Sequence, residues 1–286
     1  MLKLKNNNLV FATIIFLYIC SLSIGFYINE DLSTNGSSRD FYQTWPVILD
    51  FSKYKFDTIT EYTQHVPLHY IILSFIYKVL DNEQYVRLSY CILSLSLPIF
   101  LFLNLKKIYD YPKINLLLIS FSLILLPYFR SSSIYPNAHL TALIFLVISN
   151  YFYLKSVVDK KKIFIFLNLL FLAFSTYSMQ TYVLFYIFYL YSYFKNLSKK
   201  DFLTLFIFCI ILSIPGFILL IFNHRISSVT GQFSKDFFYT VANNFSLIGF
   251  FLVILLFNKE NFLEIKKRFF LLKKLEFFII FVFFLY

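Results

Sequence analysis

The sequence contains little glycine, little cysteine and little charge, and each shortage excludes a class of protein. Only five of the 286 residues are glycine, and apolar and polar residues rarely alternate, which argues against an outer-membrane β-barrel. Cys20, Cys91 and Cys209 all lie in apolar runs, so they indicate neither a disulfide framework nor a metal site. Charged residues make up 14% of the chain and hydrophobic residues 59%. A soluble domain has no interior large enough to bury that much apolar surface.

Long apolar runs dominate the sequence and predict transmembrane helices. A run of about 20 apolar residues can cross a bilayer as a helix. We expect about nine spans, at residues 9–28, 86–105, 114–129, 138–157, 163–178, 181–194, 202–222, 244–257 and 275–286. A secretory signal peptide is the alternative for the first run, but this run is longer than a usual signal core and no small-x-small cleavage site follows it. The sequence therefore predicts an all-α multi-pass membrane protein, with residues 1–286 as a single transmembrane domain.

The positions of the basic residues predict the topology. The formal net charge is +11, and 18 of the 26 Lys and Arg residues fall in the N-terminus and in alternate loops if the run 68–80 does not cross. If this run crossed, the Lys-rich loops would face outward, against the positive-inside rule. We therefore expect a cytoplasmic N-terminus, an outer-face loop at 29–85 and an interfacial helix at 68–80, in the inner or plasma membrane. The basic excess then faces anionic inner-leaflet lipid, so nucleic acid is not an expected partner.

The loop 29–85 concentrates the polar chemistry of the chain. It holds eight of the 15 acidic residues, among them Glu30, Asp31 and Asp40. From Asp40 to Phe51 the apolar residues recur near helical spacing, which indicates a short surface helix that begins at Asp40. Asp is a common helix N-cap, and this is the structural alternative to a catalytic role for Asp40.

A second surface helix is expected directly after Pro67. Proline suits the first turn of a helix, where its missing N–H costs little. His65 then lies just outside this helix and His69 lies one turn inside it. Carboxylates and imidazoles at a membrane surface are suited to binding the polar head group of a lipid. A carboxylate there can also remove a proton from an acceptor hydroxyl.

The order of these motifs resembles the GT-C glycosyltransferases, and among them the protein-mannosyltransferase-like group. These integral-membrane enzymes transfer a sugar from a polyprenyl-phosphate donor to a glycan, lipid or protein acceptor. The resemblance covers about residues 9–157. The motifs are Arg39-Asp40-Phe41, His65-Val66-Pro67-Leu68-His69-Tyr70, Val86-Arg87-Leu88-Ser89 and Leu126-Pro127-Tyr128-Phe129-Arg130-Ser131.

The resemblance implies roles for individual residues. Asp40 would be the catalytic general base. His65, His69, Arg87 and Arg130 would bind the donor near its phosphate. Glu30 and Asp31, the one adjacent acidic pair of this loop, are the alternative position for the acidic site. No set of metal ligands is evident, although an outer carboxylate site is compatible with a divalent ion.

Other functions stay open at this stage. A lipid-linked glycan flippase or transporter would place ionisable residues inside its spans. A surface-polysaccharide polymerase would have its large outer loop late in the chain, whereas here it comes first. The last apolar run stops at Tyr286, so an inactive, C-terminally truncated family member is a further alternative.

Overall fold

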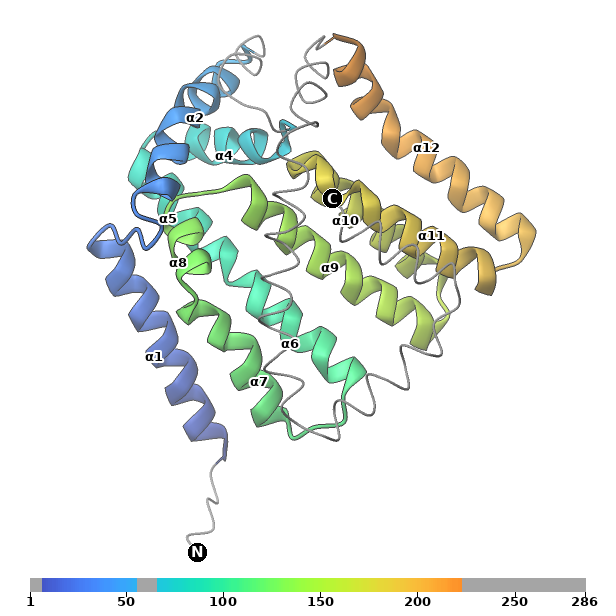
Figure 1. Ribbon diagram of the computed structural model, residues 1–286, viewed down its shortest axis with the longest axis horizontal. Coiled ribbons are helices and arrows are strands. Elements are labelled where there is room, and N and C mark those ends of the chain that lie inside the picture. Colours follow the sequence, from blue (N-terminus) through green and yellow to red (C-terminus); the bar gives the residue numbers. More distant parts are fainter. Residues whose placement is uncertain (1–6, 56–65, 223–286) are drawn as a thin grey trace, which may run out of the picture. The chain divides into compact units, whose positions relative to one another are not determined.

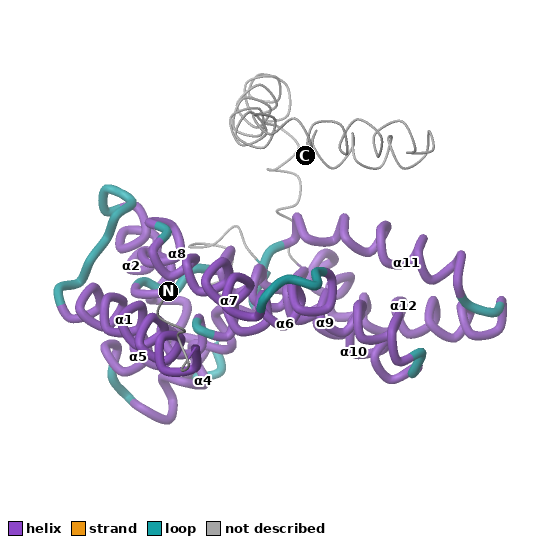
Figure 2. The backbone as a smooth tube through the Cα atoms, turned by 90° about the horizontal axis from the view of Figure 1, so that it is seen from below, coloured by secondary structure: helices purple, strands orange, loops and turns teal. Residues whose placement is uncertain are grey.

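The computed structural model describes residues 7–55 and 66–222, and in this part of the chain all regular structure is helical (Figures 1 and 2). The chain divides into two compact units, Met1–Gly216 and Phe217–Tyr286. Nearly all described residues belong to the first unit. The predicted spans 244–257 and 275–286 lie outside the described residues.

The first half of the chain forms one long helix, two shorter ones and a pair of nearly continuous helices. These are α1 (Asn7–Tyr27), α2 (Gly36–Ser52), α4 (Leu68–Leu80), α5 (Glu83–Ser94) and α6 (Ser96–Ile108). The second half continues with α7 (Lys113–Phe121), η1 (Ser122–Leu125), α8 (Pro127–Ile134), α9 (Ala138–Asp159), α10 (Lys162–Ser178), η2 (Gln180–Val183), α11 (Leu184–Asn196) and α12 (Lys199–Phe222).

Three described helices are long and apolar enough to cross a membrane, at Glu83–Ile108, Ala138–Asp159 and Lys199–Ile218. A fourth span is formed if Lys113–Leu125 and Pro127–Ile134 count as one segment, which bends by 63°. The bend has a local cause, because Pro127 has no N–H to donate and keeps the preceding Leu126 in an extended conformation. The expectation of about nine spans is therefore not met by the described residues. The all-helical, membrane-compatible architecture is confirmed.

The two surface helices predicted in the loop 29–85 are both present. α4 has the predicted bounds, and its 13 residues extend about 20 Å, less than a bilayer core of about 30 Å. α2 begins at Gly36, four residues before the predicted start at Asp40. The reason is a cap from outside the helix, since Asp31 accepts the backbone N–H of Ser38 and the Ser33 hydroxyl accepts that of Ser37.

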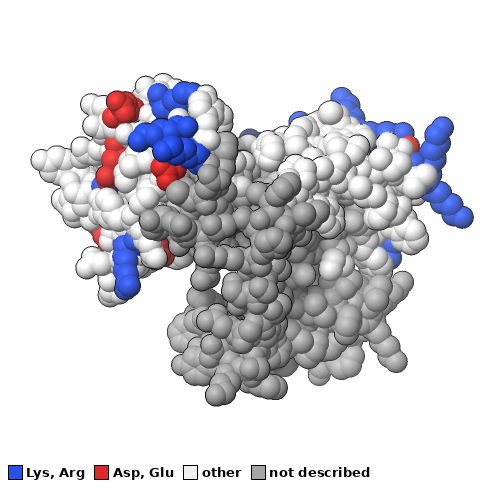
Figure 3. All heavy atoms as spheres, turned by 90° about the horizontal axis from the view of Figure 1, so that it is seen from above, with Lys and Arg blue, Asp and Glu red and all other residues white. Residues whose placement is uncertain are grey.

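The Lys-rich turns and the first loop lie at different ends of the long helices. The Lys-rich turns after α6, α9 and α11 lie at one side of the first unit, the lower right of Figure 1, whereas α2, α4 and the start of α5 lie at the other. Figure 3 shows acidic and basic side chains together at one end of the molecule and mostly basic ones at the other.

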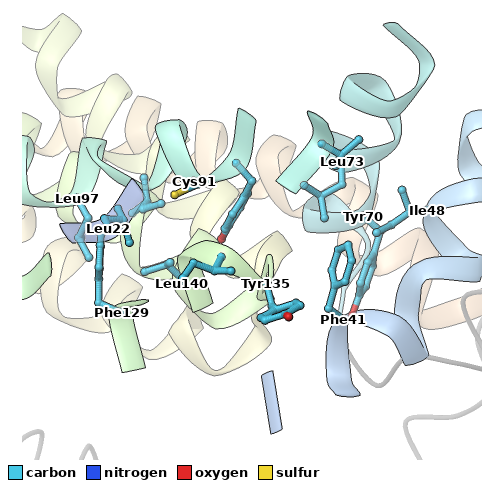
Figure 4. Close-up of a cluster of buried hydrophobic side chains, with 14 of the residues drawn as sticks. Leu22, Phe41, Ile48, Tyr70, Leu73, Cys91, Leu97, Phe129, Tyr135 and Leu140 are labelled. Carbon is cyan, nitrogen blue, oxygen red and sulfur yellow. The ribbon is translucent and has the colours of Figure 1, made fainter. Parts of the chain in front are cut away.

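A cluster of buried apolar side chains joins α2 and α4 to the ends of the long helices (Figure 4). Phe41 and Ile48 of α2 pack with Tyr70 and Leu73 of α4, and all four are at most 2% exposed. The cluster continues through Tyr135 toward α5, α8 and α9. The surface helices are therefore part of the packed core.

Uncharged polar side chains link α9, α10 and α11. The Asn168 amide donates to the backbone oxygen and to Oγ of Ser149, at 2.9 and 2.8 Å, and accepts the Tyr193 hydroxyl at 3.0 Å. Asn168 is fully buried. Interhelical hydrogen bonds of this kind fix helix pairs in a bilayer, where apolar packing alone is weakly specific.

Replacing Asn168 with Ala should lower the free energy of unfolding by about 1–2 kcal/mol, because three interhelical hydrogen bonds are lost. Thermal unfolding of the detergent-solubilised protein measures the difference. Asn196→Ala is the matched control, since exposed Asn196 bonds only within its own helix, to Ser192. Equal stability of the two variants would contradict this role for Asn168.

Candidate functional site

A polar surface pocket of about 560 Å³ lies where the first loop meets the start of α5 and the end of α8. Its walls combine amide, phenol and charged side chains: Asn29, Tyr42, Asn82, Glu83, Gln84, Arg87 and Tyr135. Asn82 is the N-cap of α5, and its side chain accepts the backbone N–H groups of Gln84 and Tyr85. The cap therefore fixes the direction in which α5 presents its first turns to the pocket.

Arg87 lines the pocket from the second turn of α5 and is only 4% exposed. Its Nε donates to the Ile134 carbonyl at 3.1 Å, and Nη2 donates to Oδ1 of Asn29 at 3.0 Å. The guanidinium also lies over the Tyr135 ring, 4.2 Å from its centroid. Among the described residues no carboxylate forms an ion pair with it. Its charge is thus buried, held by neutral partners, and available to an anion.

Glu83 and Tyr42 share the pocket with Arg87. Partial burial raises the pKa of the Tyr42 phenol, and the negative charge of Glu83 raises it further, against a smaller opposite effect of Arg87. Tyr42 therefore stays protonated at neutral pH.

Arg130, predicted to bind phosphate, is instead fully engaged inside the protein. Its Nε lies 3.0 and 3.2 Å from the two carboxylate oxygens of Glu30, and Nη2 forms an ion pair with the same group. Nη1 donates to the Ser21 hydroxyl and Nη2 to the Ser21 carbonyl, both at 3.0 Å. The two predicted residues are thus brought together, but they neutralise each other.

Gly25 makes room for this ion pair. A Cβ atom at Gly25 would overlap the Glu30 carboxylate and the Arg130 guanidinium. The backbone N–H of Glu30 also donates to the Gly25 carbonyl at 2.8 Å. The end of α1 therefore requires a residue without a side chain at position 25 for the ion pair to form.

Asp31 organises the loop before α2. Its carboxylate accepts hydrogen bonds from the Ser33 N–H and hydroxyl and from the Ser38 N–H. Partial burial raises the pKa of the Asp31 carboxyl, but these hydrogen bonds together lower it more, so the net pKa lies below its usual range. Asp31 is thus a charged cap for α2.

Asp40 is exposed on α2 and does not line the pocket. Its charge acts on His139, in the first turn of α9. Because α2 begins at Gly36, Asp40 is not the N-cap that the structural alternative assumed. The structure therefore leaves the carboxylate accessible, and its charge reaches a histidine that the sequence did not single out.

The two histidines of the Pro67 motif have different positions. His69 is 2% exposed, and its Nδ1 lies 2.7 Å from the Thr141 hydroxyl, which also hydrogen-bonds with Tyr90. His69 thus joins α4 to α9 inside the core, away from the pocket. His65 lies outside the described residues.

Sequence reasoning missed most of the pocket wall, namely Asn29, Tyr42, Asn82, Glu83, Gln84 and Tyr135. One signal was present, because Glu83 and Arg87 are four residues apart and share a face once a helix begins at Glu83. In the described ranges 7–55 and 66–222, no three His, Cys, Asp or Glu side chains gather as metal ligands would.

Comparisons with protein-family models, with curated proteins and with solved structures found no match for this chain.

Removing one partner of the Arg130–Glu30 pair should destabilise the protein strongly. Arg130→Leu is expected to lower the free energy of unfolding by about 3 kcal/mol, because Glu30 is left with an unpaired charge in a largely buried position. The double variant Glu30→Leu/Arg130→Leu should be more stable than either single variant. Thermal unfolding in detergent of the wild type, the two single variants and the double variant gives the coupling free energy between Arg130 and Glu30.

The exposed pair between Lys162 and Asp201 provides the control for this cycle. Lys162→Leu should change stability little, because solvent screens the interaction. Gly25→Ala should destabilise like Arg130→Leu, since it separates the pair without removing a charge. Single variants as stable as the wild type would refute a stabilising role for the Arg130–Glu30 ion pair.

Proposed function

We propose that this protein is a membrane glycosyltransferase that moves a sugar from a polyprenyl-phosphate donor to a cell-surface glycan, lipid or protein acceptor. One observation carries the proposal: buried Arg87 faces a polar pocket beside Glu83, without a carboxylate partner among the described residues. The resemblance of the first 157 residues to GT-C enzymes supports the same reaction class.

The pocket chemistry suits a glycosyl phosphate. Arg87 offers a buried positive charge for the phosphate, whose negative charge increases as the sugar leaves. The amides of Asn29, Asn82 and Gln84 supply donors and acceptors for sugar hydroxyls. Exposed apolar side chains on the neighbouring helices, among them Phe75 and Val79 of α4 and Leu88 and Ile92 of α5, offer a surface to the prenyl tail.

The proposal includes a membrane setting. The N-terminus and the Lys-rich turns lie on the cytoplasmic side of the cell membrane, and α2, α4 and the pocket lie on the outer side. α1, α10 and α11 join the longer helices as spans, together with the two predicted spans beyond residue 222, which gives the full set of nine.

Transport is less well supported than group transfer. Inside the long described helices the fully buried polar side chains are uncharged, as in Asn104, Thr141 and Ser149, and the buried arginine of α5 is in its second turn. A transporter would need ionisable groups along the path between the two faces.

Reporter fusions test the orientation. Alkaline phosphatase fused after Tyr54 or Glu83 should be active, because both positions are on the outer face, whereas a fusion after Asp110 should be inactive. Opposite results at Tyr54 and Glu83 would mean that α4 crosses the membrane. Green fluorescent protein at the same positions gives the complementary signal.

Arg87→Gln should weaken binding of decaprenyl phosphate by about 10- to 100-fold, since a charge-assisted hydrogen bond contributes about 1.5–3 kcal/mol. Binding is measured on protein in nanodiscs. Arg39→Gln, which removes an exposed arginine of the same loop, should leave affinity within about twofold. Equal affinities for wild type and Arg87→Gln would exclude Arg87 as the phosphate contact.

A further inference from the structure

The acids of the first loop differ in whether their carboxylates reach the pocket. Glu30 is paired with Arg130, and Asp31 is occupied in capping α2. Asp40, the base that the resemblance implies, is exposed outside the pocket wall. Glu83 is the carboxylate among the residues that line it.

The start of α5 places Glu83 beside Arg87. Glu83 is the first residue of the helix, and residues four apart lie on one face, so both side chains border the same space. They form no ion pair with each other. The carboxylate and the guanidinium therefore face the pocket as separate charges, and a ligand can bind between them.

Tyr42 and Tyr135 complete the surroundings of Glu83. Tyr42 borders the same pocket as Glu83, and its phenol remains protonated, so it does not compete with the carboxylate for a proton. Tyr135 lies across the pocket, with its ring 6.2 Å from that of Tyr42 and its face against Arg87. Among the described residues that line the pocket, the other titratable or charged groups are thus Tyr42, Arg87 and Tyr135.

We propose that Glu83 is the general base of the transfer, an inference that rests on the function proposed above. The Glu83 carboxylate takes the proton of the acceptor hydroxyl as the acceptor oxygen forms a bond to the anomeric carbon of the sugar. The bond from that carbon to the phosphate oxygen breaks, and its electron pair leaves with the polyprenyl phosphate. Arg87 stabilises this leaving group. The products are the glycosylated acceptor and polyprenyl phosphate, with no other reactant.

The test compares Glu83→Gln with Asp40→Asn in the full-length protein in nanodiscs. The donors are decaprenyl-phosphate-linked glucose, mannose, galactose and arabinose, and the acceptors are water and octyl glucoside. Released decaprenyl phosphate is measured as a function of pH. Glu83→Gln should reduce the rate at least about 100-fold and remove its fall toward acid pH, while Asp40→Asn stays within about threefold of wild type.

Two further measurements separate catalysis from folding. Glu83→Gln should still bind decaprenyl phosphate within about twofold of wild type, since Arg87 is retained. Formate should restore part of the rate to Glu83→Ala, because a small carboxylate can occupy the vacated space. Loss of phosphate binding in Glu83→Gln, or no rescue of Glu83→Ala, would reduce Glu83 to a structural role and overturn the inference.

The failure of this inference is distinguishable from the failure of the proposed function. A wild-type protein that turns over a donor, together with an active Glu83→Gln or an inactive Asp40→Asn, overturns the role of Glu83 alone. A wild-type protein that releases decaprenyl phosphate from none of the four donors overturns the proposed function, and the inference with it.

Discussion

The turn that follows α1 is held by two buried arginines, and the position of the first loop depends on this clamp. Arg130 binds Glu30, and Arg87 binds the side chain of Asn29. Ser131 and Tyr135 add hydrogen bonds to Leu32 and to the Asn29 carbonyl. α5, α8 and the residue that follows α8 thus all bind one short stretch of the chain. Because buried charges without partners cost several kcal/mol, this turn has little freedom to move away.

The two arginines have similar burial but different partners. Arg130 therefore has a structural role, whereas Arg87 is available for binding. Arg130 is neutralised by a carboxylate and satisfied by Ser21, so its charge holds α1 against α8. Among the described residues, Arg87 has neutral acceptors and aromatic faces, which fix its geometry and leave it without an ion pair. A fixed positive charge at a pocket wall is the preorganisation that stabilisation of a developing anion requires.

The local parts of this fold were predictable from sequence, and the long-range parts were not. Pro67 and the length of the apolar run gave α4 its correct bounds, because both signals are contained in the helix itself. The start of α2 was wrong because its cap, Asp31, lies outside the predicted helix. The pairing of Arg130 with Glu30 joins residues 100 positions apart, which no spacing rule reveals. The burial of His69 likewise depends on Thr141 of a distant helix.

The composition of the chain explains why a site at the helix ends is physically favourable. The longer helices meet through uncharged groups such as Asn168, Ser149 and Tyr193, whose hydrogen bonds are satisfied between the helices. Charge is costly there, so it collects where the helices end. At the end that carries α2 and α4, the short helices pack against the ends of the longer ones, and Arg87 is buried at the same end. The lipid-linked donor of the proposed function also separates a charged head group from an apolar tail, so a polar pocket next to apolar helices matches its chemistry.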